Sequence, residues 1–281
     1  MSGRYAYVAL LMKGVGYLPG VKALSASLRA SKTSYDFVLM VTPDVDVTLV
    51  TPHVDYIVQV PYLEYDTLPM KTVKQRSMYE KWMDVGYTKW NALTLSQYSK
   101  ILLLDLDIVV LENMDQLFEL QAPAATFSNA WATPYVKGRG ALYNPYIGVK
   151  HGGEVPPDAL KQGLTSSFVL IGTTVLLEPS VSVFEEFKQF MTSHQPYGHE
   201  GCYSAMDEQS LTEFYLQRST PWHHISQKWN IIPWHMKTWL PKGETPGVYH
   251  FFGDKPWNME RKAWDDLATW WRFHDSVSAS K

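Results

Sequence analysis

Two carboxylates separated by one residue stand directly after an apolar run. The run covers residues 101–104, and Asp105 and Asp107 follow it with Leu106 between them. A chain that leaves a buried strand can turn both carboxylates onto one ion, and oxygen ligands of this kind suit Mg²⁺ or Mn²⁺. Such a cation would neutralise a diphosphate and ease its departure as a leaving group. The alternative is an ordinary turn with two solvated aspartates, because Asp is common in turns.

Apolar periodicity indicates which elements carry this pair. Short apolar runs predict buried strands at residues 5–12, 37–41, 56–60, 101–104 and 168–177. Helical spacing predicts helices at residues 21–29, 77–98, 183–191 and 206–216, the second with four buried positions, Trp82, Trp90, Leu93 and Leu95. This alternation favours an α/β fold with a mostly parallel central sheet flanked by helices. Ligands of such sheets bind at the carboxyl ends of strands, where Asp105 stands.

Length and composition predict one large domain without a broad charged surface. The 281 residues, 46% of them hydrophobic, can bury a sizeable core, and we expect a single domain over residues 1–281. A net charge of -3 and the lack of a basic run exclude broad attraction to nucleic acid or anionic lipid. Residues 129–166 are rich in Gly, Pro, Asn and Tyr and lack sustained periodicity, which predicts a long ordered excursion or lid.

The single cysteine and the first apolar stretch bear on location. Cys202 is the only cysteine, so the sequence allows no internal disulfide and no thiolate-clustered zinc site, in keeping with a reducing compartment. The apolar stretch at residues 5–12 is too short for a signal-peptide core with its cleavage site, or for a membrane span. We therefore expect a cytoplasmic protein without a membrane span.

Three motifs carry a resemblance to a known family. The first is K-W-N-A-L-T-L-S-Q-Y-S-K-I-L-L-L-D-L-D at residues 89–107, followed by N-M-D-Q-L-F at 113–118. The others are Y-L-P-G-V-K-A-L-S-A-S-L at residues 17–28 and H-F-F-G-D-K-P-W at 250–257. The last is close to H-F-x-G-x-x-K-P-W and is one residue shorter. Together the motifs resemble glycosyltransferase family 8, the glycogenin-like enzymes, over about residues 5–260.

The resemblance implies a single GT-A-type domain with a Rossmann-like sheet. It also implies a retaining transfer of a hexose or related sugar from a UDP-sugar in the presence of Mn²⁺, which forms an α-glycosidic bond. His250 would be the third protein ligand beside Asp105 and Asp107, and Leu106 is counted with the donor-binding residues. An imidazole beside two carboxylates suits Mn²⁺ better than an all-oxygen Mg²⁺ site. A structural histidine is the alternative at His250.

Five further residues are matched to donor contacts of the family. Lys255 offers a positive charge and Gly253 allows close approach of backbone N–H groups, which together suit a diphosphate. Lys89 is matched to the lysine that reaches the phosphate or the donor sugar. Tyr17 and Leu10 correspond to residues packing around uracil. A surface lysine at 255 and a core aromatic at 17 are the alternatives.

The third cluster, Asp207-Glu208-Gln209, resembles the family's D-Q or E-Q segment near the reacting sugar carbon, with the alignment open by one residue. The resemblance gives Asp207, Gln209 and Lys89 catalytic roles. A carboxylate that faces the anomeric centre could stabilise an oxocarbenium-like state or act as a nucleophile, and Gln209 could hold sugar hydroxyls. Alternatively, Asp207 is only the N-cap of the following helix.

Two departures from glycogenin point to a separate acceptor. The family segment F-N-S-G-V falls on residues 170–174, so Ile171 stands where an asparagine would touch the donor. The tyrosine that glycogenin glucosylates on itself falls on Lys237, which excludes self-glucosylation at that position. We expect the excursion at 129–166 to shape the acceptor site through residues such as Trp131, Tyr135, His151 and Glu154.

Two rival functions share parts of the pattern. A non-catalytic protein that binds nucleotide sugars or carbohydrates is compatible with the same fold. A metal-dependent phosphatase of the D-x-D-x-V type would use Asp105 as nucleophile, but it also needs a later acidic pair, and Asn258 stands where the second carboxylate is wanted after Gly253-Asp254. The donor sugar, the acceptor, and whether the chain is a monomer or a homodimer are left open by the sequence.

Overall fold

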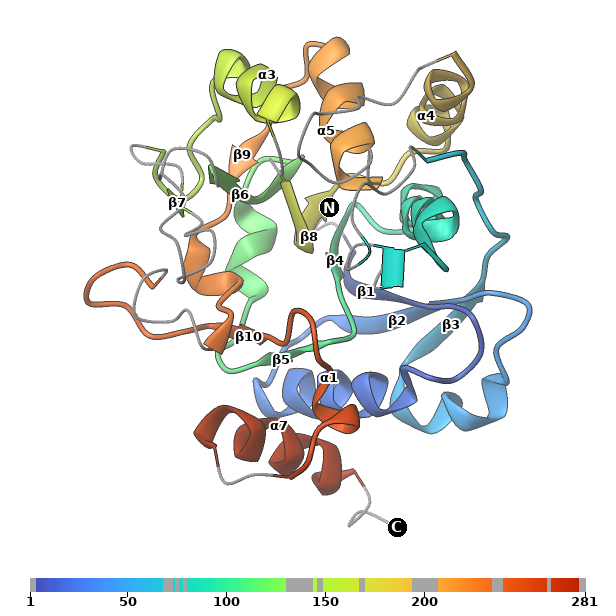
Figure 1. Ribbon diagram of the computed structural model, residues 1–281, viewed down its shortest axis with the longest axis vertical. Coiled ribbons are helices and arrows are strands. Elements are labelled where there is room, and N and C mark those ends of the chain that lie inside the picture. Colours follow the sequence, from blue (N-terminus) through green and yellow to red (C-terminus); the bar gives the residue numbers. More distant parts are fainter. Residues whose placement is uncertain are drawn as a thin grey trace.

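One mixed β-sheet organises the chain. The computed structural model describes residues 4–67, 73, 76–77, 80–129, 144–145, 149–166, 170–193, 207–233, 240–261 and 264–277. Within these residues the sheet has the order β3-β2-β1-β4-β8-β6-β7, with β9 beside β6 (Figure 1). A second, two-stranded sheet pairs β5 with β10.

Four parallel strands form one half of the main sheet: β1 (Tyr5–Leu11), β2 (Asp36–Val41), β3 (Tyr56–Gln59) and β4 (Lys100–Leu104). They coincide with four of the predicted runs, and the predicted α/β class is confirmed. In the other half, β8 (Leu170–Leu177) runs antiparallel to β4, and β6 (Ala124–Asn129) runs antiparallel to β8. The apolar runs did not indicate these directions, because a strand buried on both faces has the same pattern either way.

Four short strands complete the described set: β5 (Ile108–Val110), β7 (Asn144–Pro145), β9 (His223–His224) and β10 (Val248–His250).

Both faces of the main sheet are covered. On β4, Leu102 and Leu104 pack with α1 (Leu18–Ala30), whereas Ile101 and Leu103 face the opposite core. That opposite core includes α4 (Val181–Ser193), α5 (Asp207–Gln217) and the 3-10 helix η3 (Met83–Thr94). Helix α7 (Asp265–Ser276) packs outside α1, as Figure 1 shows. The alternation of strand side chains therefore fills two cores and leaves the carboxyl ends of the strands for a site.

Two segments differ from the sequence predictions. The helix expected over residues 77–98 is a 3-10 helix over 83–94, and Trp82 is only half-buried, while Trp90, Leu93 and Leu95 are buried as predicted. Gly86 and its β-branched neighbours lower the α-helix propensity of this segment.

The second difference lies in the excursion at 129–166, which contains a helix, α3 (Pro157–Ser166). Its short apolar pattern gave no helical signal, and Pro157 at its start is a residue common at the first turn. Two 3-10 turns, η4 (Asp115–Glu119) and η5 (Gln227–Trp229), connect the sheets, and a third, η7 (Pro256–Asn258), lies between β10 and α7. Residues 130–143 of the excursion, with Trp131 and Tyr135, lie outside the described residues.

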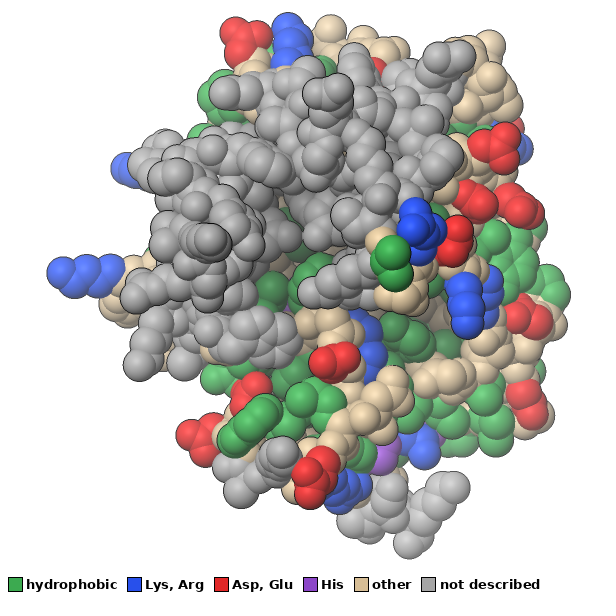
Figure 2. Space-filling view, in the orientation of Figure 1, with side chains coloured by type: hydrophobic (Ala, Val, Ile, Leu, Met, Phe, Trp, Pro, Cys, Tyr) green, Lys and Arg blue, Asp and Glu red, His purple; other side chains and the backbone are tan. Residues whose placement is uncertain are grey.

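The described surface shows no element suited to crossing a bilayer. Among the described residues, every helix is too short or too polar for a membrane span. On the coloured part of the face in Figure 2, acidic and basic side chains alternate instead of gathering by sign. This mixture accords with the small net charge of -3.

Candidate active site

The turn between β4 and β5 carries the D-x-D pair. The backbone N–H of Asp105 donates to the Thr173 carbonyl on β8, at 3.2 Å, and the Asp107 carbonyl accepts from the N–H of Phe251, at 2.9 Å. Helix α1 comes so close to this turn that a Cβ on Gly20 would lie 2.2 Å from the carbonyl oxygen of Leu106. Only glycine fits there, so the helix, the turn and the neighbouring strands fix the carboxylates together.

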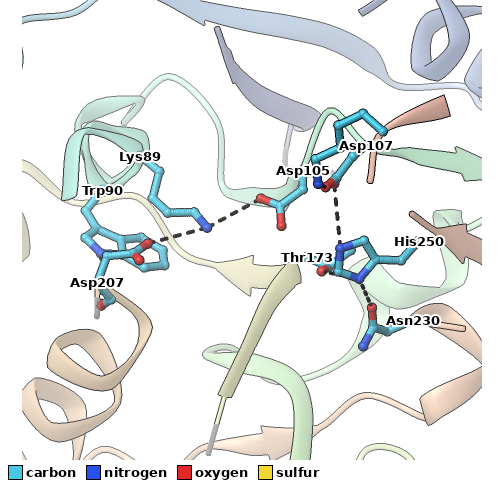
Figure 3. Close-up of polar contacts among 9 residues, drawn as sticks. Lys89, Trp90, Asp105, Asp107, Thr173, Asp207, Asn230 and His250 are labelled. Carbon is cyan, nitrogen blue, oxygen red and sulfur yellow. Dashed lines mark hydrogen bonds and ion pairs between the residues drawn. The ribbon is translucent and has the colours of Figure 1, made fainter. Parts of the chain in front are cut away.

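Asp105, Asp107 and His250 form a group that we call the strand cluster, because all three lie at strand ends. One ligand atom from each lies within 4.8 Å of the others. His250 ends β10 opposite Ile108 of β5, which places its ring beside the aspartates (Figure 3). Its Nε2 is 3.7 Å from Asp107 Oδ1. Two strands far apart in the sequence therefore bring an imidazole to the carboxylate pair.

The other ring nitrogen of His250 faces two oxygens. Nδ1 lies 2.8 Å from Asn230 Oδ1 and 3.1 Å from Thr173 Oγ1, all of them buried. An N–H at Nδ1 donates to the Asn230 oxygen, which leaves the lone pair of Nε2 facing Asp107. This tautomer is the one that ligates a metal, and such partners orient metal-binding histidines.

Asp107 has the surroundings of a cation ligand. It is 8% exposed, and among the described residues its Oδ1 has no hydrogen-bond partner. Its Oδ2 accepts from Lys255 Nζ at 2.5 Å. Burial alone would raise the pKa of Asp107, but the Lys255 ammonium, together with His250 when its ring is protonated, outweighs burial and holds the pKa well below its usual range. The site thus fits a divalent cation. Asp107 Oδ1 is buried without a hydrogen bond among the described residues, and the Lys255 ammonium supplies positive charge beside Asp107 Oδ2.

Lys255 reaches Asp107 from the loop after β10. Its Nζ also donates to the Phe251 carbonyl at 3.2 Å, and burial, which opposes its charge, is outweighed by Asp107, so its pKa is raised. Gly253 between these residues has a φ of 90°. That backbone conformation favours glycine and turns the loop back toward the D-x-D pair.

Lys89, Asp207 and Glu208 form a second group, which we call the helix cluster, because η3 and the start of α5 supply it. Lys89 Nζ lies 3.4 Å from Asp105 Oδ1 and 3.5 Å from Asp207 Oδ2, and Figure 3 shows it reaching between the two carboxylates. The indole N–H of Trp90 donates to the Asp207 carbonyl at 3.2 Å and ties η3 to α5. Lys89 therefore links the two clusters.

Burial and mutual repulsion set the charges of the helix cluster. Burial and the neighbouring Asp207 raise the pKa of Glu208 to about 8. Burial also raises the pKa of Asp207, against the effect of Lys89. Burial opposes the charge of Lys89, but Asp105, Asp207 and Glu208 outweigh it and raise its pKa. The protonated Lys89 thus lies among carboxyl groups, and ionising all of them together is unfavourable.

Comparison with known proteins places this geometry among glycosyltransferases. A family model described as "Mannosyltransferase putative" matches residues 59–136, which include Lys89 and the D-x-D pair. UDP-glucuronate:xylan alpha-glucuronosyltransferase 2 of Arabidopsis thaliana is 23% identical over 299 residues, covering 98% of this chain and 41% of the plant protein. Glycogenin-2 of Homo sapiens is 24% identical over 266 residues, covering 91% of this chain and 44% of glycogenin-2. The chain is similar in sequence to glycogenin-like glycosyltransferases.

Two further matches show similarity of sequence and of fold. An uncharacterized protein of Acanthamoeba polyphaga mimivirus is 27% identical over 262 residues and covers 90% of this chain. The crystal structure of the galactosyltransferase LgtC with donor and acceptor sugar analogs has a TM-score of 0.58 at 13% identity, covering 96% of this chain and 95% of LgtC. The resemblance to family 8 and the GT-A-type fold are thus confirmed. The glycosyltransferase chain spans less than half the length of the plant enzyme and of human glycogenin-2.

The residues expected to bind the nucleotide lie on both faces of the main sheet. Tyr17 precedes α1, is 41% exposed, and packs edge-on against Trp257 with ring centroids 5.0 Å apart. Burial raises its pKa, and Lys255 lies close enough to lower it. Leu10 is half-buried near the end of strand β1, and the Leu106 side chain is buried in the core under α1. Leu106 can therefore offer a donor only its backbone.

The remaining predicted residues fall at different places. Gln209 is buried in the first turn of α5, beside the helix cluster in sequence, and Ile171 is half-buried on β8. His151 Nδ1 accepts from the N–H of Ser226 at 3.1 Å, and Glu154 forms a β-bridge with His223. These excursion residues thus pack beside β9. Lys237 lies outside the described residues.

Sequence reasoning missed three residues of the glycosyltransferase site. Asn230 and Thr173 orient His250, and Gly172 on β8 lies against Lys89 and Glu208. A signal for Gly172 was present, because a glycine inside an apolar strand often marks close approach of another group. A polar Asn230 between Trp229 and Ile231 was a weaker signal, since most buried polar residues only satisfy the backbone.

Proposed function

We propose that the chain is a Mn²⁺-dependent retaining glycosyltransferase that moves a hexose or related sugar from a UDP-sugar to a separate acceptor. The observation that carries this proposal is the strand cluster at a strand end, joined through Lys89 to two further carboxyl groups. The UDP donor is supported by the plant relative, whose name specifies UDP-glucuronate. The family model with a mannosyltransferase name matches neither Tyr17 nor Lys255, so it has little weight for the donor.

The strand cluster would hold the cation through Asp105, Asp107 and the Nε2 of His250. When bound, Mn²⁺ would act as a Lewis acid that neutralises the diphosphate of the donor. Two carboxylates and one imidazole favour Mn²⁺ over Mg²⁺, because Mg²⁺ prefers oxygen ligands alone. Lys255 then has a role of its own, because its ammonium can leave Asp107 and pair with the diphosphate.

The helix cluster would act on the sugar. Lys89 orients the donor from between Asp105 and Asp207, and a carboxylate at the start of α5 faces the anomeric carbon. That carboxylate stabilises positive charge at the carbon or attacks it, which gives retention and an α-glycosidic bond. Over the whole reaction, the bond between the anomeric carbon and the diphosphate oxygen breaks, and a bond between the anomeric carbon and the acceptor oxygen forms. The proton of the acceptor hydroxyl passes to the departing diphosphate, and UDP is released with it.

A separate acceptor follows from the position of Lys237, where glycogenin has its own acceptor tyrosine. Lysine cannot form the same glycosidic bond through oxygen. We propose that the excursion at 129–166 forms part of the acceptor site. Deletion of residues 130–143 is expected to abolish transfer to the true acceptor while donor hydrolysis continues, and unchanged transfer would refute this role.

The proposed function is tested by UDP release. Purified protein is incubated with Mn²⁺ and each of several UDP-sugars, with GDP-mannose as a competing donor class, for the wild type and Asp107→Ala. We expect release from at least one UDP-sugar by the wild type only. If no donor is turned over, a non-catalytic binding protein is the better account, and release from GDP-mannose alone would overturn the UDP donor.

A further inference from the structure

Gly172 on β8 lies directly against the charged ends of the helix cluster. A Cβ at this position would be 2.6 Å from Glu208 Oε1 and 2.8 Å from Lys89 Nζ. Heavy atoms without a bond between them are normally about 3.5 Å apart or more. A methyl group would therefore occupy space that the carboxylate and the ammonium fill, and neither could stay where it is.

The atoms that crowd Gly172 differ from those that crowd other close glycines. A Cβ at Gly20 would meet the backbone oxygen of Leu106, and one at Gly247 would meet the Trp229 ring at 2.4 Å. At those two positions the fold itself would have to shift. At Gly172 the nearest atoms are the far ends of two flexible side chains, so a methyl group would move the charged groups and leave the fold intact.

Glu208 depends on this space for its orientation. Its Oε2 is buried and, within the described part of the chain, accepts no hydrogen bond. Hydrogen bonds thus fix this carboxyl group less than packing against the bare backbone of β8 does. The next residue of β8, Thr173, accepts the N–H of Asp105. Glu208 therefore packs against Gly172, and the next residue of β8, Thr173, contacts the D-x-D turn.

Asp207 is held by η3, because its Oδ2 lies 3.5 Å from the Nζ of Lys89 on that helix. Its carbonyl is tied to the Trp90 indole, and its Oδ1 lies 3.7 Å from the position of a Cβ on Gly86, which belongs to η3. It is also more deeply buried than Glu208, at 5% exposed. The two carboxyl groups at the start of α5 therefore face different elements, Asp207 facing η3 and Glu208 facing the strand beside the D-x-D pair.

We propose that Gly172 is a positioning residue whose missing side chain leaves room for the charged ends of Lys89 and Glu208 beside β8, and that Glu208, not Asp207, is the carboxylate presented to the donor sugar. This inference rests on the proposed transferase function. It settles the one-residue ambiguity of the Asp207-Glu208-Gln209 segment in favour of Glu208, and it assigns a function to a glycine that has no chemistry of its own.

The test adds a methyl group and then removes a methylene. Gly172→Ala is expected to lower kcat for UDP release about 10²-fold, as a displacement near 1 Å can do, with little change in donor KM. Glu208→Asp shortens the carboxylate, so in the Gly172→Ala background it should raise kcat about tenfold, whereas alone it should lower kcat. Gly86→Ala is the matched control, because its methyl would meet the Trp82 ring at 3.4 Å, an ordinary contact, and should leave kcat near that of the wild type.

The outcomes separate this inference from the proposed function. All variants are compared by thermal unfolding, and Gly172→Ala should melt within about 3 °C of the wild type. If the wild type releases no UDP from any donor, the proposed function fails and the inference falls with it. If the wild type turns over and Gly172→Ala matches its kcat, only this inference fails. Loss of kcat in Gly172→Ala without recovery on adding Glu208→Asp overturns the role given to Glu208.

Discussion

The strand cluster and the helix cluster meet at one end of the sheet but are held in place differently. Backbone hydrogen bonds and β-pairing fix Asp105, Asp107 and His250, and Asn230 orients the histidine ring. In the helix cluster, Lys89 is placed by charge, and Glu208 by packing against Gly172. The first arrangement suits a small ion with demanding ligand geometry, whereas the second leaves side chains free to adjust to a larger substrate.

Removal of one strand-cluster carboxylate should have the largest effect. In Asp107→Asn, the buried anion that Lys255 and His250 surround is lost, so Mn²⁺ binding and UDP release should both fall, the latter about 10³-fold. Isothermal titration with Mn²⁺ in the presence of UDP measures the first and a UDP assay the second. Asp275→Asn, on the surface of α7, is the control. Intact Mn²⁺ affinity in Asp107→Asn would contradict the strand cluster as the cation site.

Neutralisation of the helix cluster should spare the cation. Above pH 8, where the Glu208 carboxyl group is ionised, Glu208→Gln is expected to lower kcat about 10²-fold with Mn²⁺ affinity unchanged, because the lost charge acts on the sugar alone. Asp207→Asn should lower kcat less, since Asp207 faces η3. A greater loss in Asp207→Asn than in Glu208→Gln, measured at saturating donor and Mn²⁺, would reverse the assignment of the two carboxyl groups.

Loss of the group that orients His250 should weaken the cation site without abolishing it. Asn230→Ala removes the acceptor of the Nδ1 proton, and Mn²⁺ affinity should fall by roughly 10-fold to 100-fold. Activity should recover in part at high Mn²⁺, because the ligands themselves remain. Thr173→Val, which removes the longer contact to Nδ1, should have the smaller effect. Equal Mn²⁺ affinities in Asn230→Ala and the wild type would show that His250 needs no such partner.

A last prediction concerns the pH dependence of stability. The pKa of Glu208 is raised to about 8 from an ordinary value of 4.5, so between these values the folded chain keeps a proton that the unfolded chain releases. Glu208 therefore makes the folded state less stable as pH rises through this window, and below pH 4.5 it makes no such contribution. Thermal unfolding with a chelator should show Glu208→Gln gaining stability relative to the wild type as pH rises from 5 to 8, by up to about 1 kcal/mol per pH unit. A difference that stays constant with pH would show that Glu208 is not held in the neutral form.

The sequence allowed the strand cluster to be predicted further than the helix cluster. Apolar runs placed Asp105 at a strand end, and the motif at 250–257 led to His250, which the structure brings beside Asp107. The helix cluster depends on how α5 approaches β8, and no local pattern encodes that distance. A glycine inside the apolar run of β8 indicated close approach of another group, but only the structure identifies that group as Lys89 and Glu208. The segment at 207–209 left open the choice between Asp207 and Glu208. The roles of Leu10, Tyr17, Gln209 and Gly253 are still predictions.

The two-cluster account is tested most directly by a crystal structure with Mn²⁺ and an unreactive UDP-sugar analogue, with anomalous data at the manganese edge. We predict one manganese peak within bonding distance of Asp105, Asp107 and His250 Nε2. The anomeric carbon of the sugar should lie between that peak and the Glu208 carboxyl group, with Lys255 on the diphosphate. A manganese peak away from the strand cluster, or a sugar on the side away from Glu208, would contradict the account.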